Sequence, residues 1–157
     1  QERHDRLIRE RVHDPYKARQ QPAEPLVCPN CGAVRAKGRW QWMDRPPAEA
    51  ESQRCPACQR IHDRVPAGFL TLEGPFLDTH RDEILRLVHH TVDQQRQEHP
   101  MKRLMEIDQQ ADDRVELRFT DLHLPRGVGE AIRNAYDGEL TLNYTEEGGI
   151  LRAYWRR

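Results

Sequence analysis

The stretch CPNCGAVRAKGRWQW at residues 28–42, followed by CPAC at residues 55–58, decides how the first part of this chain folds. All the cysteines of the chain lie in these two Cys-x2-Cys pairs: Cys28, Cys31, Cys55 and Cys58. Two residues between cysteines allow both sulfurs of a pair to face one point, so two pairs can surround a tetrahedral ion at about 2.3 Å. We predict a zinc ribbon with one structural Zn²⁺ and no open coordination position for hydrolysis.

Two disulfides or a redox dithiol are the alternative interpretations of these cysteines. A Cys-x2-Cys spacing that occurs twice favours a metal, because redox dithiols are usually single pairs. Reduced cysteines held by a metal are typical of the cytoplasm, where we expect the protein to act.

Composition limits the remaining possibilities. The chain has 157 residues, enough for one domain or two small ones, and 32% of them are charged. No apolar run approaches the roughly 20 residues of a membrane span, and no secretory segment is visible. The net charge of −1 is uneven, because residues 1–66 contain 13 Lys/Arg against 9 Asp/Glu while residues 67–157 contain 12 against 17. This basic excess indicates either a polyanionic partner or a solubilising surface.

The pattern along the chain predicts an α+β protein with an N-terminal zinc ribbon, a helix and a small β-β-α-β-β domain. We expect a basic arm at 1–25, the ribbon at 26–73, a helical connector at 74–100 and the α+β domain at 101–157. Within the ribbon, a strand at 69–72 is expected to close a three-stranded sheet over the metal. The connector helix is expected to start near Asp78 or Thr79, since Thr79 and Asp82 resemble a capping box, and to stop at Pro100.

The last domain is predicted from its alternating and helical periods. A hairpin is expected from 104–109 and 114–120, with Val115, Leu117 and Phe119 on one face. Pro125 should open a helix, and two strands should follow at 139–145 and 150–155. A single helix would cover one sheet face and leave the other for the ribbon or a ligand.

Cations and tryptophans around the cysteines predict contacts with RNA. Trp40 and Trp42 share one face of a strand, where they can pack a small core beside the metal or stack on bases. The cations can form a rim that binds phosphates. The predicted RNA-binding residues are Arg6, Arg9, Arg11, Lys17, Arg19, Arg35, Lys37, Arg39, Trp40, Trp42, Arg45, Arg54 and Arg60.

No motif for catalysis or for a second metal is evident. Ser52 is the only serine, and no nucleophile lies beside a base in the sequence. Asp121 is better suited to shaping the turn before a helix than to acid–base chemistry. His89 and His90 are adjacent and would point about 100° apart on a helix. We therefore expect neither an enzyme nor a small-molecule substrate.

The order of the motifs resembles the nonsense-mediated decay protein three family. A Cys-Pro-x-Cys-Gly knuckle precedes the stretch from Gly38 to Trp42 and a second Cys-Pro-x-Cys; the segment from Val115 to Asp121, a helix and the stretch Gly138-Glu-Leu-Thr-Leu follow. The chain resembles most the short bacterial relatives of this family of large-ribosomal-subunit adaptors. It lacks the further Cys-x2-Cys pairs and the long C-terminal region with nuclear export signals, so the export role does not transfer.

The resemblance implies docking on large-subunit rRNA, at the face that meets the small subunit near the tRNA sites. It assigns the zinc to the four cysteines and the RNA contacts chiefly to the region from Arg35 to Arg45. The expected role is ribosome hibernation or subunit maturation, with the ribosome, its rRNA and ribosomal proteins as partners and no membrane contact. The alternatives are a protein- or DNA-binding transcription accessory factor and a redox switch that ejects its zinc on oxidation.

Overall fold

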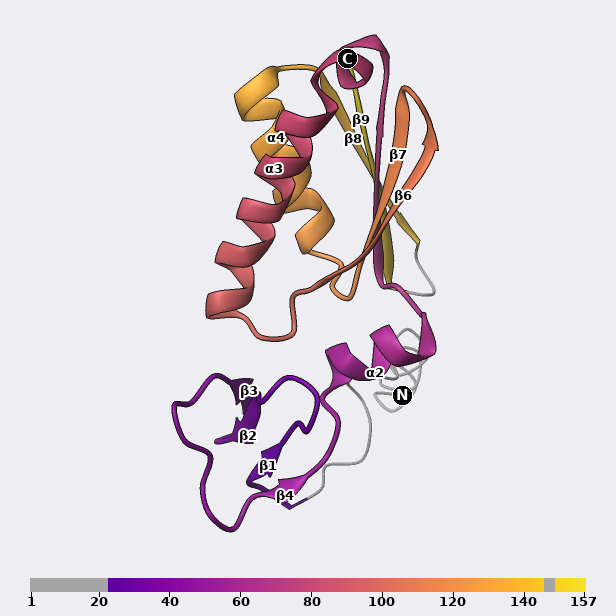
Figure 1. The fold of residues 1–157 in the computed structure, drawn as a ribbon. Helices are drawn as coiled ribbons and strands as arrows, with labels where there is room; N and C mark the ends of the chain where they lie inside the picture. Colours follow the sequence, from indigo (N-terminus) through magenta and orange to yellow (C-terminus); the bar gives the residue numbers. More distant parts are fainter. Residues whose placement is uncertain (1–22, 146–148) are drawn as a thin grey trace, which may run out of the picture.

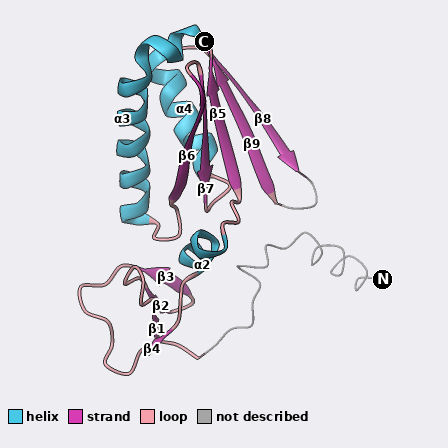
Figure 2. Cartoon of the chain, turned by 45° about the vertical axis from the view of Figure 1, so that its right-hand side comes forward, coloured by secondary structure: helices cyan, strands magenta, loops and turns pink. Residues whose placement is uncertain are grey.

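The computed structural model describes residues 23–145 and 149–157, which form two connected parts (Figure 1). We call residues 26–63 the cysteine head and residues 68–157 the sheet domain. The head lies beneath one end of the sheet domain, and helix α2 stands between its small strands and the large sheet (Figure 2).

The cysteine head contains four short strands in the order β3-β2-β1-β4. Their bounds are Leu26–Val27 for β1, Val34–Ala36 for β2, Arg39–Gln41 for β3 and Glu51–Ser52 for β4. Strands β2 and β3 form a hairpin whose two turn residues, Lys37 and Gly38, both have positive φ, at 56° and 81°. Two positive φ values match the twist of the flanking strands, so the turn projects Lys37 at the tip of the hairpin.

Helix α2, Pro56–Asp63, follows the second cysteine pair and was not expected from the sequence. Cys55 is its N-cap and Pro56 opens it, in the position where a missing N–H costs nothing. The helix ends at Arg64, which has the left-handed φ of 60°. The predicted second knuckle is therefore the first turn of a helix.

The sheet domain is built on five strands in the order β6-β7-β5-β9-β8. Their bounds are Gly68–Glu73 for β5, Leu104–Ala111 for β6, Arg114–Phe119 for β7, Glu139–Thr145 for β8 and Ile150–Arg156 for β9. Strand β5 lies in the centre, antiparallel to β7 and parallel to β9. The order β5-α3-β6-β7-α4 and a final hairpin extends the split β-α-β arrangement by one strand.

Helices α3, Pro75–Glu98, and α4, Leu124–Tyr136, both cover the same face of this sheet (Figure 1). Ile84, Val88 and Val92 of α3 and Val128 and Ile132 of α4 are buried against it. From the sheet, the core contains fully buried side chains of β5, β7 and β9: Leu70, Leu72, Val115, Leu117, Phe119, Leu151, Ala153 and Trp155. The periodic prediction for Val115, Leu117 and Phe119 is confirmed, as are the hairpin and the last two strands.

The sheet pairing corrects the predicted role of residues 69–72. This segment is a strand, but it is the central strand of the large sheet and does not close a sheet over the metal. The helix at 75–98 packs on that sheet, so it is part of the sheet domain and not a connector. The β-β-α-β-β unit expected at 101–157 is the larger part of this domain. Local propensity identified the strand but carried no information on its partners.

The start of α3 also differs from the expectation. The helix begins at Pro75 after Gly74, whose φ of 117° and close approach to the Arg157 carbonyl exclude a side chain. His80 has non-helical angles, φ −125° and ψ 21°, so the helix bends there. The Thr79 hydroxyl donates to the Phe76 carbonyl at 3.2 Å and does not cap a helix start.

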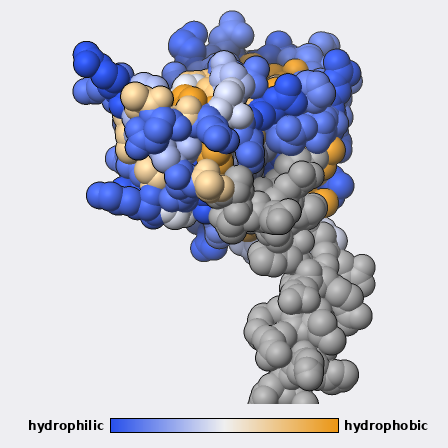
Figure 3. Space-filling view, turned by 90° about the horizontal axis from the view of Figure 1, so that it is seen from below, coloured by the Kyte–Doolittle hydropathy of each residue, from blue (hydrophilic) through white to orange (hydrophobic). Residues whose placement is uncertain are grey.

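The face of the molecule on the side of the cysteine head is mostly polar where the described residues are visible (Figure 3). Seen from the side of the cysteine head, apolar side chains form only small separate patches among hydrophilic ones (Figure 3). None of the helices in the described ranges combines the length and apolar character that crossing a membrane requires.

Candidate metal centre

The first cysteine pair lies in the tight turn between β1 and β2. The Cys28 N–H donates to the Ala33 carbonyl at 2.8 Å, and the Gly32 N–H donates to the Cys28 carbonyl at 2.9 Å. Gly32 has a φ of 86°, a conformation in which a Cβ is strained. The turn directs the Ala33 N–H toward the Cys31 sulfur at 3.5 Å, where it can stabilise a thiolate.

The second pair occupies the first turn of α2. The Cys58 N–H donates to the Cys55 sulfur at 3.3 Å, so Cys55 caps the helix with its side chain. A helix N-terminus carries partial positive charge, which favours thiolates at both positions. Cys-Pro-Ala-Cys therefore supplies its two sulfurs from a rigid helical turn.

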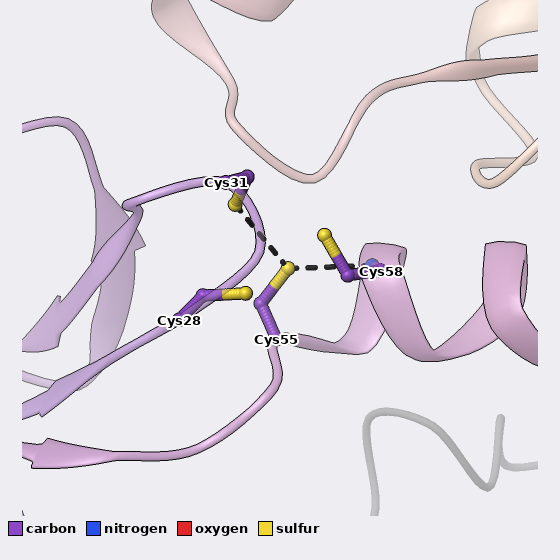
Figure 4. A group of neighbouring side chains, drawn as sticks. All are labelled: Cys28, Cys31, Cys55 and Cys58. Atoms are coloured by element: carbon purple, nitrogen blue, oxygen red, sulfur yellow. Dashed lines mark hydrogen bonds between the residues drawn. The ribbon is translucent and has the colours of Figure 1, made fainter.

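The four sulfurs converge on one point (Figure 4). All of them lie within 4.8 Å of one another, and the Cys31 and Cys55 sulfurs are 3.8 Å apart. A tetrahedral ion at about 2.3 Å from each sulfur requires S–S distances of about 3.8 Å, which this cluster nearly provides. The cysteines are free thiols, so the disulfide interpretation is not what the structure contains. The cluster is compatible with a metal ion bound by four protein ligands.

Without a cation, electrostatics disfavour more than one thiolate among Cys31, Cys55 and Cys58. The hydrogen bond with Cys55, which outweighs burial, lowers the pKa of Cys31 to about 4. The same hydrogen bond and burial raise the pKa of Cys55. Burial, followed by the charge of Cys31, raises the pKa of Cys58. A Cys31 thiolate thus disfavours ionisation of Cys55 and Cys58, and a bound cation would offset this repulsion.

A buried arginine of the sheet domain contacts the cluster. Arg103 follows α3 and is only 5% exposed. Its Nη1 is 3.7 Å from the Cys58 sulfur and its Nη2 is 4.0 Å from the Cys55 sulfur, while its Nε donates to the Pro100 carbonyl at 2.7 Å. Burial acts to lower the pKa of Arg103, but the neighbouring sulfurs outweigh it and the pKa is raised. The guanidinium can therefore offset the negative charge of a tetrathiolate site.

The Arg103 backbone is held by the end of β7. The Arg103 N–H donates to the Thr120 hydroxyl at 2.9 Å, and that hydroxyl donates to the Met101 carbonyl at 2.7 Å. Thr120 is only 6% exposed, and Met101 packs against the cysteines. The metal centre is thus completed by a loop of the sheet domain that lies more than forty residues further along the chain.

Trp42 makes a second contact between the two parts. Its indole N–H donates to the Arg96 carbonyl at 2.7 Å, near the end of α3. The guanidinium groups of Arg96 and Arg103 each lie 5.9 Å from its ring centroid. Trp40 is half-buried and packs against the cysteines. Trp40 thus packs beside the cysteines, as the core interpretation predicted, whereas Trp42 connects the head to α3.

The structure divides the predicted RNA-binding cations into three groups. Arg6, Arg9, Arg11, Lys17 and Arg19 lie outside the described residues. Three others contact residues in or next to the head. Arg35 forms an ion pair with Glu24 at 2.9 Å, and Arg54 donates hydrogen bonds to Asn30 at 3.1 Å and to Gln59 at 3.3 Å. Arg60 is 7% exposed and donates a hydrogen bond to the Val65 carbonyl at 2.8 Å. The remaining cations are exposed: Lys37, Arg39 and Arg45.

Within the described residues, histidines and carboxylates form no comparable site. Over residues 23–145 and 149–157, the four cysteines are the one group of three or more metal-ligand side chains brought together. Asp121 accepts from the N–H groups of His123 at 2.9 Å and Leu124 at 2.8 Å, which confirms its role in shaping the turn into α4. Arg103 was missed by sequence reasoning, because no local pattern marks an arginine that meets its partners only after folding.

No protein-family model, curated protein or solved structure matches this chain. The resemblance described above therefore rests on the motifs alone, and the function is argued from the site.

Proposed function

We propose that the chain is a non-catalytic, zinc-containing factor that docks on ribosomal RNA through its cysteine head. Four thiolates within 4.8 Å of one another favour Zn²⁺ over oxygen-preferring ions. All four coordination positions are supplied by the protein, which is the arrangement of structural zinc sites. The metal then acts as the organising centre of the head.

A cationic tip on the metal-supported head supports the RNA partner. Lys37 and Arg39 are exposed at the β2–β3 hairpin, and Arg45 is exposed in the loop that follows. The β2–β3 hairpin leads directly from the first cysteine turn, so a bound metal would fix the backbone that carries Lys37 and Arg39. Cations on a rigid support bind phosphates with small loss of conformational entropy.

The ribosome is proposed as the partner because of the motif order, with large-subunit rRNA near the tRNA sites as the docking position. Hibernation and subunit maturation are both roles for a factor that occupies this position. The cytoplasm is the compartment that this proposal requires.

A sucrose gradient of cell lysate tests the proposal. The full chain should sediment with ribosomal particles at low salt and leave them as salt rises, because phosphate contacts release counterions. The double variant Lys37→Glu/Arg39→Glu should lose this association. Each lost phosphate contact should reduce the slope of log K against log salt by about 0.7–0.9.

A matched control has the same change of charge on the sheet domain. Arg86 and Arg133 are exposed on α3 and α4, so Arg86→Glu/Arg133→Glu should sediment as the unmodified chain does. Absence of the unmodified chain from ribosomal fractions at low salt would overturn the proposal. Co-purification with DNA in place of rRNA would instead favour a transcription accessory factor.

A further inference from the structure

The two edge strands of the large sheet, β6 and β8, differ in how they are protected from pairing with a strand of another chain. Strand β6 carries Glu106 and Asp108 and has two register shifts against β7, between Leu104 and Glu106 and between Gln109 and Ala111. Bulges and charges are the usual devices that prevent an edge strand from pairing with another chain. Strand β6 is therefore poorly suited to pairing with a strand of another chain.

Strand β8 has no register shift, and its one charged residue is Glu139 at its start. It pairs with β9 in unbroken register from Glu139 to Thr145, and no charged residue occurs from Leu140 to Thr145. It is the last strand in the sheet order, and no strand among the described residues lies on its outer side (Figure 2). The backbone N–H and C=O groups on that side are available to a further strand.

Exposed apolar side chains accompany this open edge. Leu140 packs beneath Gly129 of α4, so it faces the helices. Alternation places Leu142 and Tyr144 on the same side, and they are 37% and 51% exposed. Thr141 and Asn143 occupy the opposite face. The strand therefore has an apolar side and an uncharged polar side along one free edge.

The sequence of β8 is complementary to itself. In an antiparallel pair related by a twofold axis at Leu142, each Leu142 lies opposite its copy and Leu140 lies opposite Tyr144. Thr141 then lies opposite Asn143. Every apolar residue meets an apolar residue, both polar pairs can hydrogen-bond, and no like charges are opposed.

We propose that β8 pairs with β8 of a second copy of this chain and joins two sheets into one continuous sheet. This pairing is independent of RNA binding, since it involves only the outer edge of the sheet domain. Because the strand is short and contributes few apolar side chains, the dimer should be weak and dependent on concentration.

Analytical ultracentrifugation of the full, metal-loaded chain tests this proposal. The mass should rise from 18.5 kDa toward twice that value as the protein is concentrated through the micromolar range. Thr141→Lys/Asn143→Lys places like charges directly opposite each other in both polar pairs and should raise the dimer dissociation constant about tenfold or more. Gln110→Lys on the other edge should leave it unchanged.

A charge-complementary variant tests the register. Thr141→Glu/Asn143→Lys places opposite charges across the same pairs and should dimerise at least as well as the unmodified chain. Circular dichroism should confirm that every variant is folded. A chain that stays monomeric at all concentrations, a doubly lysine-substituted variant that still dimerises, or a charge-complementary variant that does not would each overturn the proposal.

Discussion

The cysteine head and the sheet domain stabilise their folds in different ways. The sheet domain buries large side chains such as Trp155, Phe119 and Leu117 between one sheet face and two helices. The head buries one larger apolar side chain, Leu26, and otherwise small ones together with three of its cysteines: Ala33, Val34, Ala57, Cys28, Cys55 and Cys58. Its strands contain only two or three residues each.

The difference indicates which part would need a metal in order to fold. A unit with so little apolar surface cannot offset the entropy of ordering its chain, so small domains of this kind need a metal or disulfides. The sheet domain has a core of its own. Arg103 and Trp42 connect the two parts, and we expect the head to rely on this connection more than the sheet domain does.

Removal of one ligand should have the largest effect. We expect Cys55→Ser to leave the head unfolded and without metal, because a structural zinc supplies about 10–16 kcal/mol of binding free energy in small zinc domains. Hydrogen exchange should show loss of protection in β1 to β4 and α2, while β5, β7 and β9 stay protected. Simultaneous loss of protection in the sheet domain would show that it has no independent stability.

Truncation of a buried side chain in the sheet domain should destabilise that domain and leave the metal site of the head intact. Leu117→Ala should lower the free energy of unfolding of this domain by about 2–5 kcal/mol, since it leaves a cavity in a fully buried site. Urea denaturation measures this loss, and metal content should remain unchanged. Ile61→Ala, at a site that is 40% exposed on α2, serves as the control and should cost less than about 0.5 kcal/mol.

Loss of the buried guanidinium should affect the metal. Arg103→Met keeps the stem but removes the charge next to Cys55 and Cys58, and we expect metal affinity to fall about 10- to 100-fold. Competition with a chromophoric chelator measures this change. Lys102→Met removes a neighbouring charge that contacts Gln95, and should have no such effect. Equal affinity for the Arg103 variant and the unmodified chain would exclude charge compensation.

The smallest effect is expected at the tryptophan contact. Trp42→Phe keeps an aromatic ring but removes the hydrogen bond to the Arg96 carbonyl, which should cost about 0.5–1.5 kcal/mol. The loss should appear in the unfolding of the head and not in that of the sheet domain. An unchanged unfolding free energy of the head would mean that this hydrogen bond contributes nothing to the connection.

Local patterns predicted the elements better than their partners. The alternation at Val115, Leu117 and Phe119 identified a strand with one buried face, and Pro125 marked the next helix correctly. The strand at 69–72 was also recognised, but its neighbours β7 and β9 lie far along the chain. Nothing local distinguishes a central strand of one sheet from an edge strand of another.

The sequence predicted the ligands of the candidate site but not the residues and helix that surround them. The spacing of the cysteines was enough to predict that their four sulfurs converge, and the structure places these sulfurs within 4.8 Å of one another. Helix α2 was missed, although Pro56 directly after a capping residue is a signal for a helix start. Arg103 could not be found, because its role depends on the loop after α3 returning to the head.

The central claim is that one zinc ion bound by four thiolates organises the head. X-ray absorption at the zinc edge, combined with elemental analysis of protein purified without added metal, tests it most directly. We predict one zinc per chain with four sulfur neighbours at about 2.3 Å. A folded head without metal, a disulfide between these cysteines, or a coordination shell containing oxygen or nitrogen would contradict this account.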